Sequence, residues 1–221
     1  MNDRLKRLKQ ILQSIPKSEQ NDDNHKDLTS LNGYLTRRDF DCLNAPNYLN
    51  DNVIFYYLCH LFSNISNAMV FDPLFYSSVV KNGKVSLPSL EKWTKRKALN
   101  FIDSFFLPLN TGNHWILIAI MKNEKNIYFY ALDSLNVDRV DLLIEVFQVF
   151  QHLLNISHDN CFFTIADTPK QENGYDCGLY LLKYAELLSR SKDIMVNFCF
   201  LFRKSFITST LIGSRKEQSR N

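Results

Sequence analysis

The chain has 221 residues, of which 45% are hydrophobic and 13% aromatic, enough for one globular domain with a sizeable core. Its 26 Lys and Arg residues nearly balance 23 Asp and Glu residues, so the charge does not indicate a nucleic-acid partner. The sequence has no apolar run of the ~18 residues that a membrane span needs, and the start "MNDRLKRLKQILQSIP" is too charged for a secretory signal. We therefore expect an intracellular protein with no nucleic-acid or membrane partner.

The cysteines are Cys42, Cys59, Cys161, Cys177 and Cys199. Their number is odd, and they include neither a CxxC pair nor a ladder of ligand spacings. This pattern argues against a disulfide scaffold and against a zinc site. We expect no metal and no cofactor, and a reducing environment.

The N-terminal part of the chain falls into two segments. Apolar residues at near-helical spacing predict an amphipathic helix over 5–15 that ends before Pro16. Residues 17–27, "KSEQNDDNHKD", contain no apolar residue and are typical of a flexible linker. We therefore expect a helix and linker over 1–27 and a folded domain over 28–221.

The rest of the chain predicts an α+β domain, with helices around a central sheet. A turn around Pro46 precedes a helix that is capped by Asn50 or Asp51. Segments rich in β-branched and aromatic residues predict strands, and segments with helical periodicity predict further helices. The strands are expected at 104–109, 114–121, 127–135 and 161–167, and the helices at 89–103, 140–155 and 177–188.

Two of these strands predict a hairpin that carries polar groups at its open end. The residues "KNEKN" between 115–121 and 127–133 suit a tight turn. If Asn123 and Glu124 form a two-residue loop, His114 lies opposite Asp133. The hairpin would then place an imidazole beside a carboxylate.

The stretch "PKQENGYDCGLYLLKYAELL", residues 169–188, places Cys177 between a turn-forming run and a helix. The first turn of a helix stabilises a thiolate, and a cysteine nucleophile needs a base whose tautomer a third group fixes. Gln171 and the backbone N–H of Cys177 are suited to stabilise an oxyanion. His114, Asp133, Cys177 and Gln171 are therefore candidates for a cysteine-protease site. The remaining four cysteines lie in apolar company, which favours a packing role.

The order "GNHWILIAI", "YALDSL" and "PKQENGYDCGLYLLKY" closely resembles the ubiquitin-like protein proteases of the Ulp and sentrin-specific (SENP) type. The resemblance extends to "LTRRDFDCLNAPNYLND", "FDPLFYSSVV" and "EKWTKRK", and covers roughly residues 28–188. It implies a papain-like architecture with a central mixed or antiparallel sheet. It also implies His114 as base, Asp133 as its partner, Cys177 as nucleophile and Gln171 in the oxyanion hole.

The resemblance further implies a thiol protease that cleaves after the C-terminal Gly-Gly of a ubiquitin-like modifier, in conjugates, in precursors or in both. Trp115 would form one wall of a channel for this tail. Tyr48 stands where the family usually has a second tryptophan, and Asp51 matches a position that contacts a basic residue of the modifier. The "LFYSSVV" and "KWTKRK" segments favour SUMO as the modifier, and the resemblance implies a monomer in the nucleus, the cytoplasm or both.

Three alternatives stay open at this point. The modifier can instead be of the Rub or Nedd type, or ubiquitin itself. The same order of His, acid and Cys occurs in bacterial effector acetyltransferases, which would make the chain a transferase. A degenerate protease that only binds a modifier is the third, although the four intact site residues speak against it.

Overall fold

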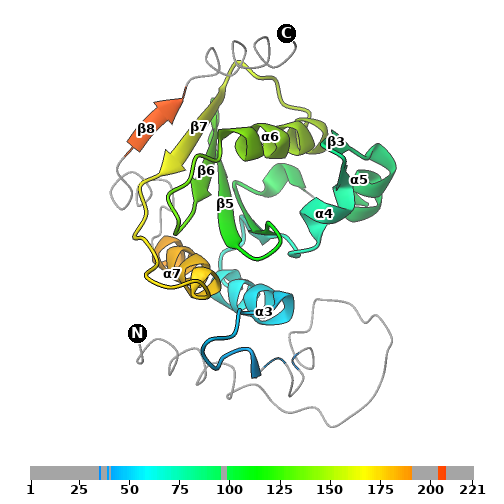
Figure 1. Ribbon diagram of the computed structural model, residues 1–221. Coiled ribbons are helices and arrows are strands. Elements are labelled where there is room, and N and C mark those ends of the chain that lie inside the picture. The colour runs from blue at the N-terminus through cyan, green and yellow to red at the C-terminus, as the bar shows by residue number, and fades with distance from the viewer. Residues whose placement is uncertain (1–34, 36–38, 40, 96–98, 191–203, 208–221) are drawn as a thin grey trace.

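The computed structural model describes residues 35, 39, 41–95, 99–190 and 204–207 (Figure 1). The helix predicted over 5–15, the linker over 17–27, the domain boundary near residue 28, and Cys199 lie outside the described residues. Within the described part of the chain, no helix is long and apolar enough to cross a membrane.

A six-stranded mixed sheet runs through the centre of the molecule (Figure 1). In spatial order its strands are β1 (Ala68–Val70), β4 (Ser104–Asn110), β5 (Trp115–Lys122), β6 (Ile127–Leu132), β7 (Cys161–Ala166) and β8 (Lys204–Ile207). The pairs β4–β5, β5–β6 and β7–β8 are antiparallel, whereas β1–β4 and β6–β7 are parallel. The predicted α+β class, with a mixed sheet flanked by helices, is therefore confirmed.

Helices cover both faces of this sheet, because its central strands are apolar on both sides. Along β5, Leu117 and Ala119 face one layer of helices, while Ile116 and Ile118 face the other, as the two-residue period of a strand requires. The first layer contains α3 (Asp51–Phe62) and α7 (Cys177–Ser189), and the second contains α4 (Phe75–Val79), α5 (Leu87–Thr94) and α6 (Val140–Leu154).

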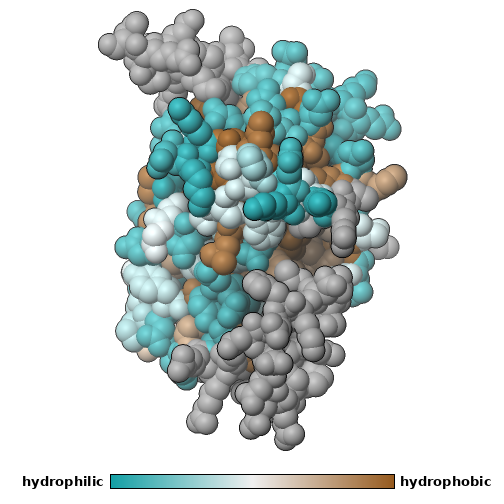
Figure 2. Space-filling view, turned by 90° about the vertical axis from the view of Figure 1, so that its right-hand side faces the viewer, coloured by the Kyte–Doolittle hydropathy of each residue, from teal (hydrophilic) through white to brown (hydrophobic). Residues whose placement is uncertain are grey.

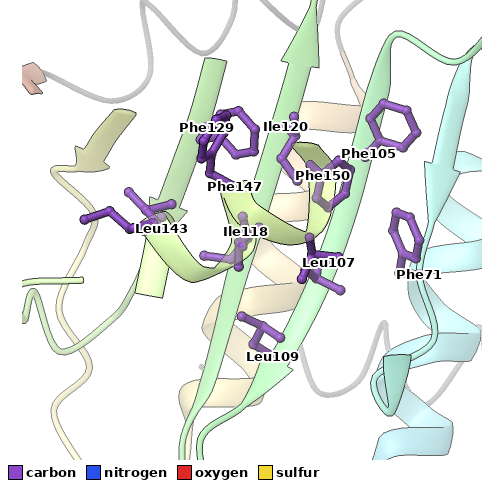
Figure 3. Close-up of a cluster of buried hydrophobic side chains, with 14 of the residues drawn as sticks. Phe71, Phe105, Leu107, Leu109, Ile118, Ile120, Phe129, Leu143, Phe147 and Phe150 are labelled. Carbon is purple, nitrogen blue, oxygen red and sulfur yellow. The ribbon is translucent and has the colours of Figure 1, made fainter. Parts of the chain in front are cut away.

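The second layer is packed mainly by aromatic and branched aliphatic side chains (Figure 3). Phe150 of α6 lies edge-on to Phe105 of β4 and Phe129 of β6, with ring centroids 5.4 and 6.1 Å apart. Edge-to-face contacts of this kind add to the free energy gained by burial. Helix α6 is the connection between the parallel strands β6 and β7, and these contacts hold it against the sheet.

A short hairpin and a 3-10 turn complete the part of this layer around α4 and α5. The hairpin consists of β2 (Val80–Lys81) and β3 (Lys84–Val85), and the 3-10 turn η1 covers Leu99–Phe101. Figure 2 shows the face on this side of the molecule, where hydrophilic side chains surround several hydrophobic areas. Among the exposed large apolar residues of the described chain are Leu74, Leu87 and Phe101.

Two local predictions need correction. Lys122 pairs with Ile127, so the hairpin loop is 123–126 rather than two residues, and each partner on β6 moves by two positions. The side chain of Asn123 accepts hydrogen bonds from the backbone N–H groups of Lys125 and Asn126, which closes this wider turn. The helix predicted over 89–103 is also too long, because α5 ends at Thr94 and the turn η1 begins at Leu99.

The start of α3 and the start of α7 lie against each other. The side chain of Asn50 accepts a hydrogen bond from the N–H of Val53, so of the two predicted caps, Asn50 and Asp51, Asn50 is the N-cap. A β-carbon at Gly178 would lie only 2.9 Å from Cβ of Leu49. Leu49 cannot easily move away, because its carbonyl accepts a hydrogen bond of 2.8 Å from Nε1 of Trp115. Glycine is therefore required for this close approach of α7.

Replacing this glycine tests the packing directly. Gly178→Ala should lower the free energy of unfolding by about 1 kcal/mol, because overpacking typically costs ~1–3 kcal/mol and the better helix propensity of alanine returns ~1 kcal/mol. Gly174→Ala is the matched control, since a β-carbon there meets nothing within 4 Å, and it should change stability by less than ~0.5 kcal/mol. Urea unfolding measures both, and equal stability of the two variants would contradict the packing account.

Candidate active site

Three polar side chains from separate segments meet beside one end of the sheet, where His114 interacts with Asp133 and Cys177, and Gln171 lies on a neighbouring loop. His114 lies in the turn between β4 and β5, and Asp133 follows the last residue of β6. Because β5 and β6 are antiparallel, the start of one strand lies beside the end of the other. Gln171 follows β7, which is parallel to β6 and finishes at the same end of the sheet, and Cys177 is the first residue of α7.

His114 is held by its neighbours on the turn. Gly112 has a φ of 103°, a conformation that favours glycine, and it lets the chain reverse over a few residues. The N–H of Thr111 donates to the carbonyl of His114 at 2.9 Å, and β4 and β5 pair directly at Asn110 and Trp115. The imidazole is therefore carried on a rigid connection between two central strands.

The imidazole of His114 and the carboxylate of Asp133 form a buried pair. Nε2 of His114 donates to Oδ1 of Asp133 at 2.6 Å. This bond leaves Nδ1 as the ring nitrogen that is free to exchange a proton with another group. The sequence-based pairing of these two residues therefore holds in the structure, although the strand register differs from the predicted one.

The carboxylate of Asp133 accepts hydrogen bonds from two further groups. The backbone N–H of Leu135 donates to Oδ1 at 2.9 Å, and Nε of Arg139 donates to Oδ2 at 2.6 Å. Burial alone would raise the pKa of Asp133, but the hydrogen bonds from His114, Leu135 and Arg139 and the charge of His114 hold it below its usual range. Asp133 is therefore an ionised carboxylate at neutral pH.

His114 also interacts with the thiol of Cys177. Burial alone would lower the pKa of His114, but hydrogen bonds to Asp133 and Cys177, together with their negative charges, raise it from 6.5 to about 9. The imidazolium form is therefore favoured when a thiolate and a carboxylate lie on its two sides. This arrangement is what a cysteine nucleophile requires of its base.

Cys177 differs in its surroundings from the other described cysteines. Its backbone belongs to the first turn of the 13-residue helix α7, where unpaired N–H groups favour negative charge. Burial raises the pKa of Cys59 to about 12 and that of Cys161 to about 11, in both cases with help from a nearby carboxylate. The pKa of Cys42 is also raised, chiefly by burial. These three thiols stay protonated at neutral pH, as their predicted packing role requires.

The loop before Cys177 is tied to the helix that follows it. Tyr184 and Tyr180, one turn apart on α7, donate hydrogen bonds to the carbonyls of Pro169 and Lys170 at 2.8 and 3.1 Å. The side chain of Asn173 accepts hydrogen bonds from the N–H groups of the two residues before Cys177 and donates to the carboxylate of Asp176. These bonds fix the path of the chain from Gln171 to the thiol.

Of the three residues that the resemblance assigns to substrate binding, Tyr48 and Asp51 lie just before and at the start of α3, and Trp115 begins β5. Trp115 is only 2% exposed, and its indole N–H donates to the carbonyl of Leu49. Tyr48, the neighbour of Leu49, is 46% exposed. Asp51 is half-buried in the first turn of α3, and burial together with the nearby charge of Asp72 raises its pKa. The indole thus links the strand behind His114 to the segment that carries Tyr48 and Asp51.

Sequence reasoning missed the contact of Arg139 with Asp133. It also missed the hydrogen bonds that the Gln171 side chain makes with Ser134 and Asn173. Arg139 comes six residues after Asp133 and reaches it across a loop in which Asn136 has a φ of 52°. No periodicity indicates such a contact, so the only available signal was a cation close to Asp133 in the chain. Among the described residues, no group of three or more His, Cys, Asp or Glu side chains is placed to hold a metal ion.

Comparison with known proteins agrees with this geometry. A model of the Ulp1 protease family, C-terminal catalytic domain, matches residues 47–205. This is a family of cysteine proteases, and the chain belongs to it.

Individual relatives show how far the likeness extends. The chain is 28% identical over 196 residues to the ubiquitin-like-specific protease ESD4 of Arabidopsis thaliana, and this match covers 75% of the chain but 36% of that relative. It is 30% identical over 192 residues to the NEDD8-specific protease 1 of the same plant, covering 75% of the chain and 76% of the relative. The chain thus spans about a third of the longer of these two relatives.

A solved structure shares the fold. The C-terminal Ulp1 protease domain, in complex with Smt3, the yeast ortholog of SUMO, superposes with a TM-score of 0.60 at 24% identity. The superposition covers 88% of this chain and 86% of that domain. This match confirms the predicted architecture.

The raised pKa of His114 can be measured by an NMR titration of the ring. We expect a His114 pKa of about 9 in the unmodified protein. This pKa should fall further in Asp133→Asn than in Cys177→Ala, because the carboxylate makes the larger contribution. Because the folded-state pKa lies above the unfolded value of 6.5, the stability that this charged pair contributes is complete below about pH 6.5 and is lost as the pH rises through about 9. A His114 pKa at or below 6.5 in the unmodified protein would contradict the pairing.

Proposed function

We propose that the chain is a thiol protease that cleaves after the C-terminal Gly-Gly of a ubiquitin-like modifier, with SUMO as the favoured modifier. In this proposal Cys177 is the nucleophile, His114 the base, Asp133 the group that orients the base, and Gln171 a donor to the oxyanion. The observation that carries the proposal is the linked series Asp133, His114 and Cys177, in which a buried carboxylate fixes the imidazole beside a thiol at a helix N-terminus.

In the first half-reaction the thiolate of Cys177 attacks the carbonyl carbon of the terminal glycine. A carbon–sulfur bond forms, and the carbonyl oxygen becomes an oxyanion near the N–H of Cys177 and the carboxamide of Gln171. His114, protonated at Nδ1, then gives this proton to the leaving amine as the carbon–nitrogen bond breaks. Asp133 keeps the bond to Nε2 throughout, so the ring keeps the same tautomer and orientation.

In the second half-reaction a water molecule attacks the thioester. His114 accepts one proton from the water at Nδ1, and the carbon–sulfur bond breaks to release the modifier as a carboxylic acid, which loses its remaining proton to solvent and becomes a carboxylate. The Cys177 thiolate and the His114 imidazolium are thereby regenerated. Attack on a peptide bond matures a precursor, whereas attack on an isopeptide bond removes the modifier from a conjugate.

The selectivity for glycine is assigned to the segment that Trp115 holds in place. Tyr48 exposes an aromatic ring there, and the Trp115 indole is bonded to the adjacent residue, Leu49. In this proposal the two aromatic residues would line a narrow passage, and such a passage would admit only residues without a β-carbon. It would also hold the extended tail against the thiol, which lowers the entropic part of the barrier.

A modifier of the Nedd type is the second candidate. The NEDD8-specific relative is 30% identical, and the match covers 76% of its length, more than twice the 36% covered in ESD4. SUMO is favoured by the match to the Ulp1 domain that was solved in complex with Smt3, and by the segments "LFYSSVV" and "KWTKRK". Side-by-side assays with both modifiers decide between them.

We place this enzyme inside the cell, in the nucleus, the cytoplasm or both, and propose that it acts as a monomer. The four described cysteines are free thiols, and the nucleophile must stay reduced to react. Microscopy of a tagged chain and native mass spectrometry of the purified protein test the two statements.

A panel of C-terminal amide reporters made from SUMO, a Nedd-type modifier and ubiquitin tests the function. We expect fastest cleavage of SUMO, no cleavage by Cys177→Ala, almost none by His114→Ala, and a large loss of kcat in Asp133→Asn. Cys161→Ala is the matched control, because this thiol is buried away from His114, and it should change stability more than kcat. Turnover by Cys177→Ala would refute the mechanism, and equal rates for all modifiers would remove the preference for SUMO.

The role of Asp51 can be separated from its place in a helix. Asp51→Lys should slow cleavage of full-length SUMO but leave cleavage of a short Gly-Gly peptide reporter unchanged, because a carboxylate that pairs with a basic residue of the modifier becomes a like charge. Asp141→Lys is the matched control, since Asp141 occupies the first turn of α6 in the other helical layer. It loses the same favourable contact with a helix N-terminus but should leave both rates unchanged.

If Asp51→Lys lowered the cleavage rates of both substrates equally, Asp51 would act through the fold of α3 and not through a contact with the modifier. Thermal unfolding of the two lysine variants, measured beside the rates, distinguishes this outcome from a loss of modifier contact.

A further inference from the structure

The serine of the Asp133–Ser134 pair takes no part in the reaction steps above, although it is as deeply buried as the aspartate. Ser134 is 1% exposed, and its side chain contacts the loop that follows β7. There the hydroxyl of Ser134 lies 2.5 Å from Oε1 of Gln171. The backbone N–H of Gln171 also donates to the carbonyl of Ser134 at 3.0 Å. Ser134 therefore contacts the oxyanion donor through both its backbone and its side chain.

The other end of the Gln171 carboxamide is also fixed. Nε2 donates to the carbonyl oxygen of Asn173 at 2.6 Å. A backbone carbonyl can only accept a hydrogen bond, so it determines which end of the carboxamide is nitrogen. Oε1 must then face Ser134, and the hydroxyl must be the donor in that contact. A rotation of the carboxamide by half a turn would bring two acceptors together at Asn173.

These two contacts leave one N–H of the carboxamide without a partner among them. A carboxamide carries two N–H donors, and only one is used by Asn173. An oxyanion donor is effective when its direction is fixed before the charge develops. A hydrogen bond to Oε1 also polarises the amide, which strengthens the donor at the opposite end. The contact from Ser134 thus affects both the direction and the strength of the remaining N–H.

We propose that Ser134 is a positioning residue of the oxyanion hole, which holds the carboxamide of Gln171 with one N–H directed to the developing oxyanion. This inference rests on the proposed function, because it assigns Ser134 a role only through Gln171. Topology explains the pairing, since β6 and β7 are parallel neighbours whose ends lie side by side. Ser134 and Gln171 follow these two strands.

A double-mutant cycle with a SUMO C-terminal amide reporter tests the proposal in the full chain. Gln171→Ala should lower kcat by about 10²-fold, as loss of one oxyanion donor does. Ser134→Ala should lower kcat by about 10-fold with KM unchanged. The double variant should be no slower than Gln171→Ala, because Ser134 has no other route to the reaction. The NMR-determined pKa of His114 should stay at its wild-type value in Ser134→Ala, since the bond from Asp133 does not involve the hydroxyl.

Thr164→Val is the matched control. The hydroxyl of Thr164 is equally buried, on β7, and has no hydrogen-bond partner among the described residues. Its removal should leave kcat unchanged. Ser134→Cys keeps the shape of the side chain but replaces the hydroxyl with a slightly larger and weaker donor, so its kcat should fall between those of the wild type and Ser134→Ala. If thermal unfolding shows that Ser134→Ala is unstable, Ser134→Cys replaces it in the double-mutant cycle with Gln171→Ala.

The outcomes separate this inference from the proposed function. If Gln171→Ala slows the reaction but Ser134→Ala matches the wild type, the positioning role is wrong and the protease mechanism stands. Multiplicative losses in the double variant would likewise overturn it, because Ser134 would then act independently of Gln171. If the wild-type chain cleaves no reporter, or Gln171→Ala has no effect, the failure lies in the proposed function, and the inference falls with it.

Discussion

The site depends on the burial of one carboxylate, that of Asp133. An isolated carboxylate would be costly to bury, and this one is stabilised by an imidazole, a guanidinium and a backbone N–H. His114 as imidazolium and Arg139 as guanidinium supply two positive charges. Asp133 and a Cys177 thiolate supply two negative charges, so the group is neutral. In the proposed mechanism, the ion pair of thiolate and imidazolium therefore forms without leaving net charge in the interior.

The same residue also anchors the backbone of the surrounding loops. The carbonyl of Asp133 accepts hydrogen bonds from the hydroxyl of Thr168 at 2.6 Å and from the N–H of Asn136 at 3.1 Å. These bonds join the loop after β6 to the loop after β7, which leads to Gln171. The tyrosines of α7 then hold the second loop from the other side. Asp133 thus connects the groups assigned to the base, the oxyanion donor and the nucleophile through a series of hydrogen bonds.

The sequence predicts those parts of this arrangement that follow from short-range patterns. β-Branched and aromatic residues identify the central strands, and the choice of Asn50 or Asp51 as cap places the start of α3 to within one residue. The pairing of His114 with Asp133 was predicted from a register that is wrong by two residues. It holds because a shift of two keeps every side chain on its original face of the sheet, so the imidazole and the carboxylate still come within hydrogen-bond distance.

The parts that could not be predicted depend on loops that bend in three dimensions. Arg139 reaches Asp133 only because the chain reverses at Asn136, and an Arg at that spacing has no preferred direction in a sequence. The partners of Gln171 are equally invisible, since the contact with Ser134 is made across 37 positions. The length of α5 was overestimated because helical periodicity continues into residues that form the separate turn η1.

The division of the molecule into two helical layers has a consequence for how the sequence can change over time. Helices α3 and α7, with the loops that precede them, carry the candidate nucleophile and the segment assigned to the substrate, whereas α6 touches only the opposite side of the sheet. Volume-preserving substitutions around α6 therefore reach the site through the central strands and through Arg139, which immediately precedes α6 and bonds to Asp133. We expect homologues to accept volume-preserving changes most readily along α6 itself, and new specificities to arise at the ends of α3 and α7.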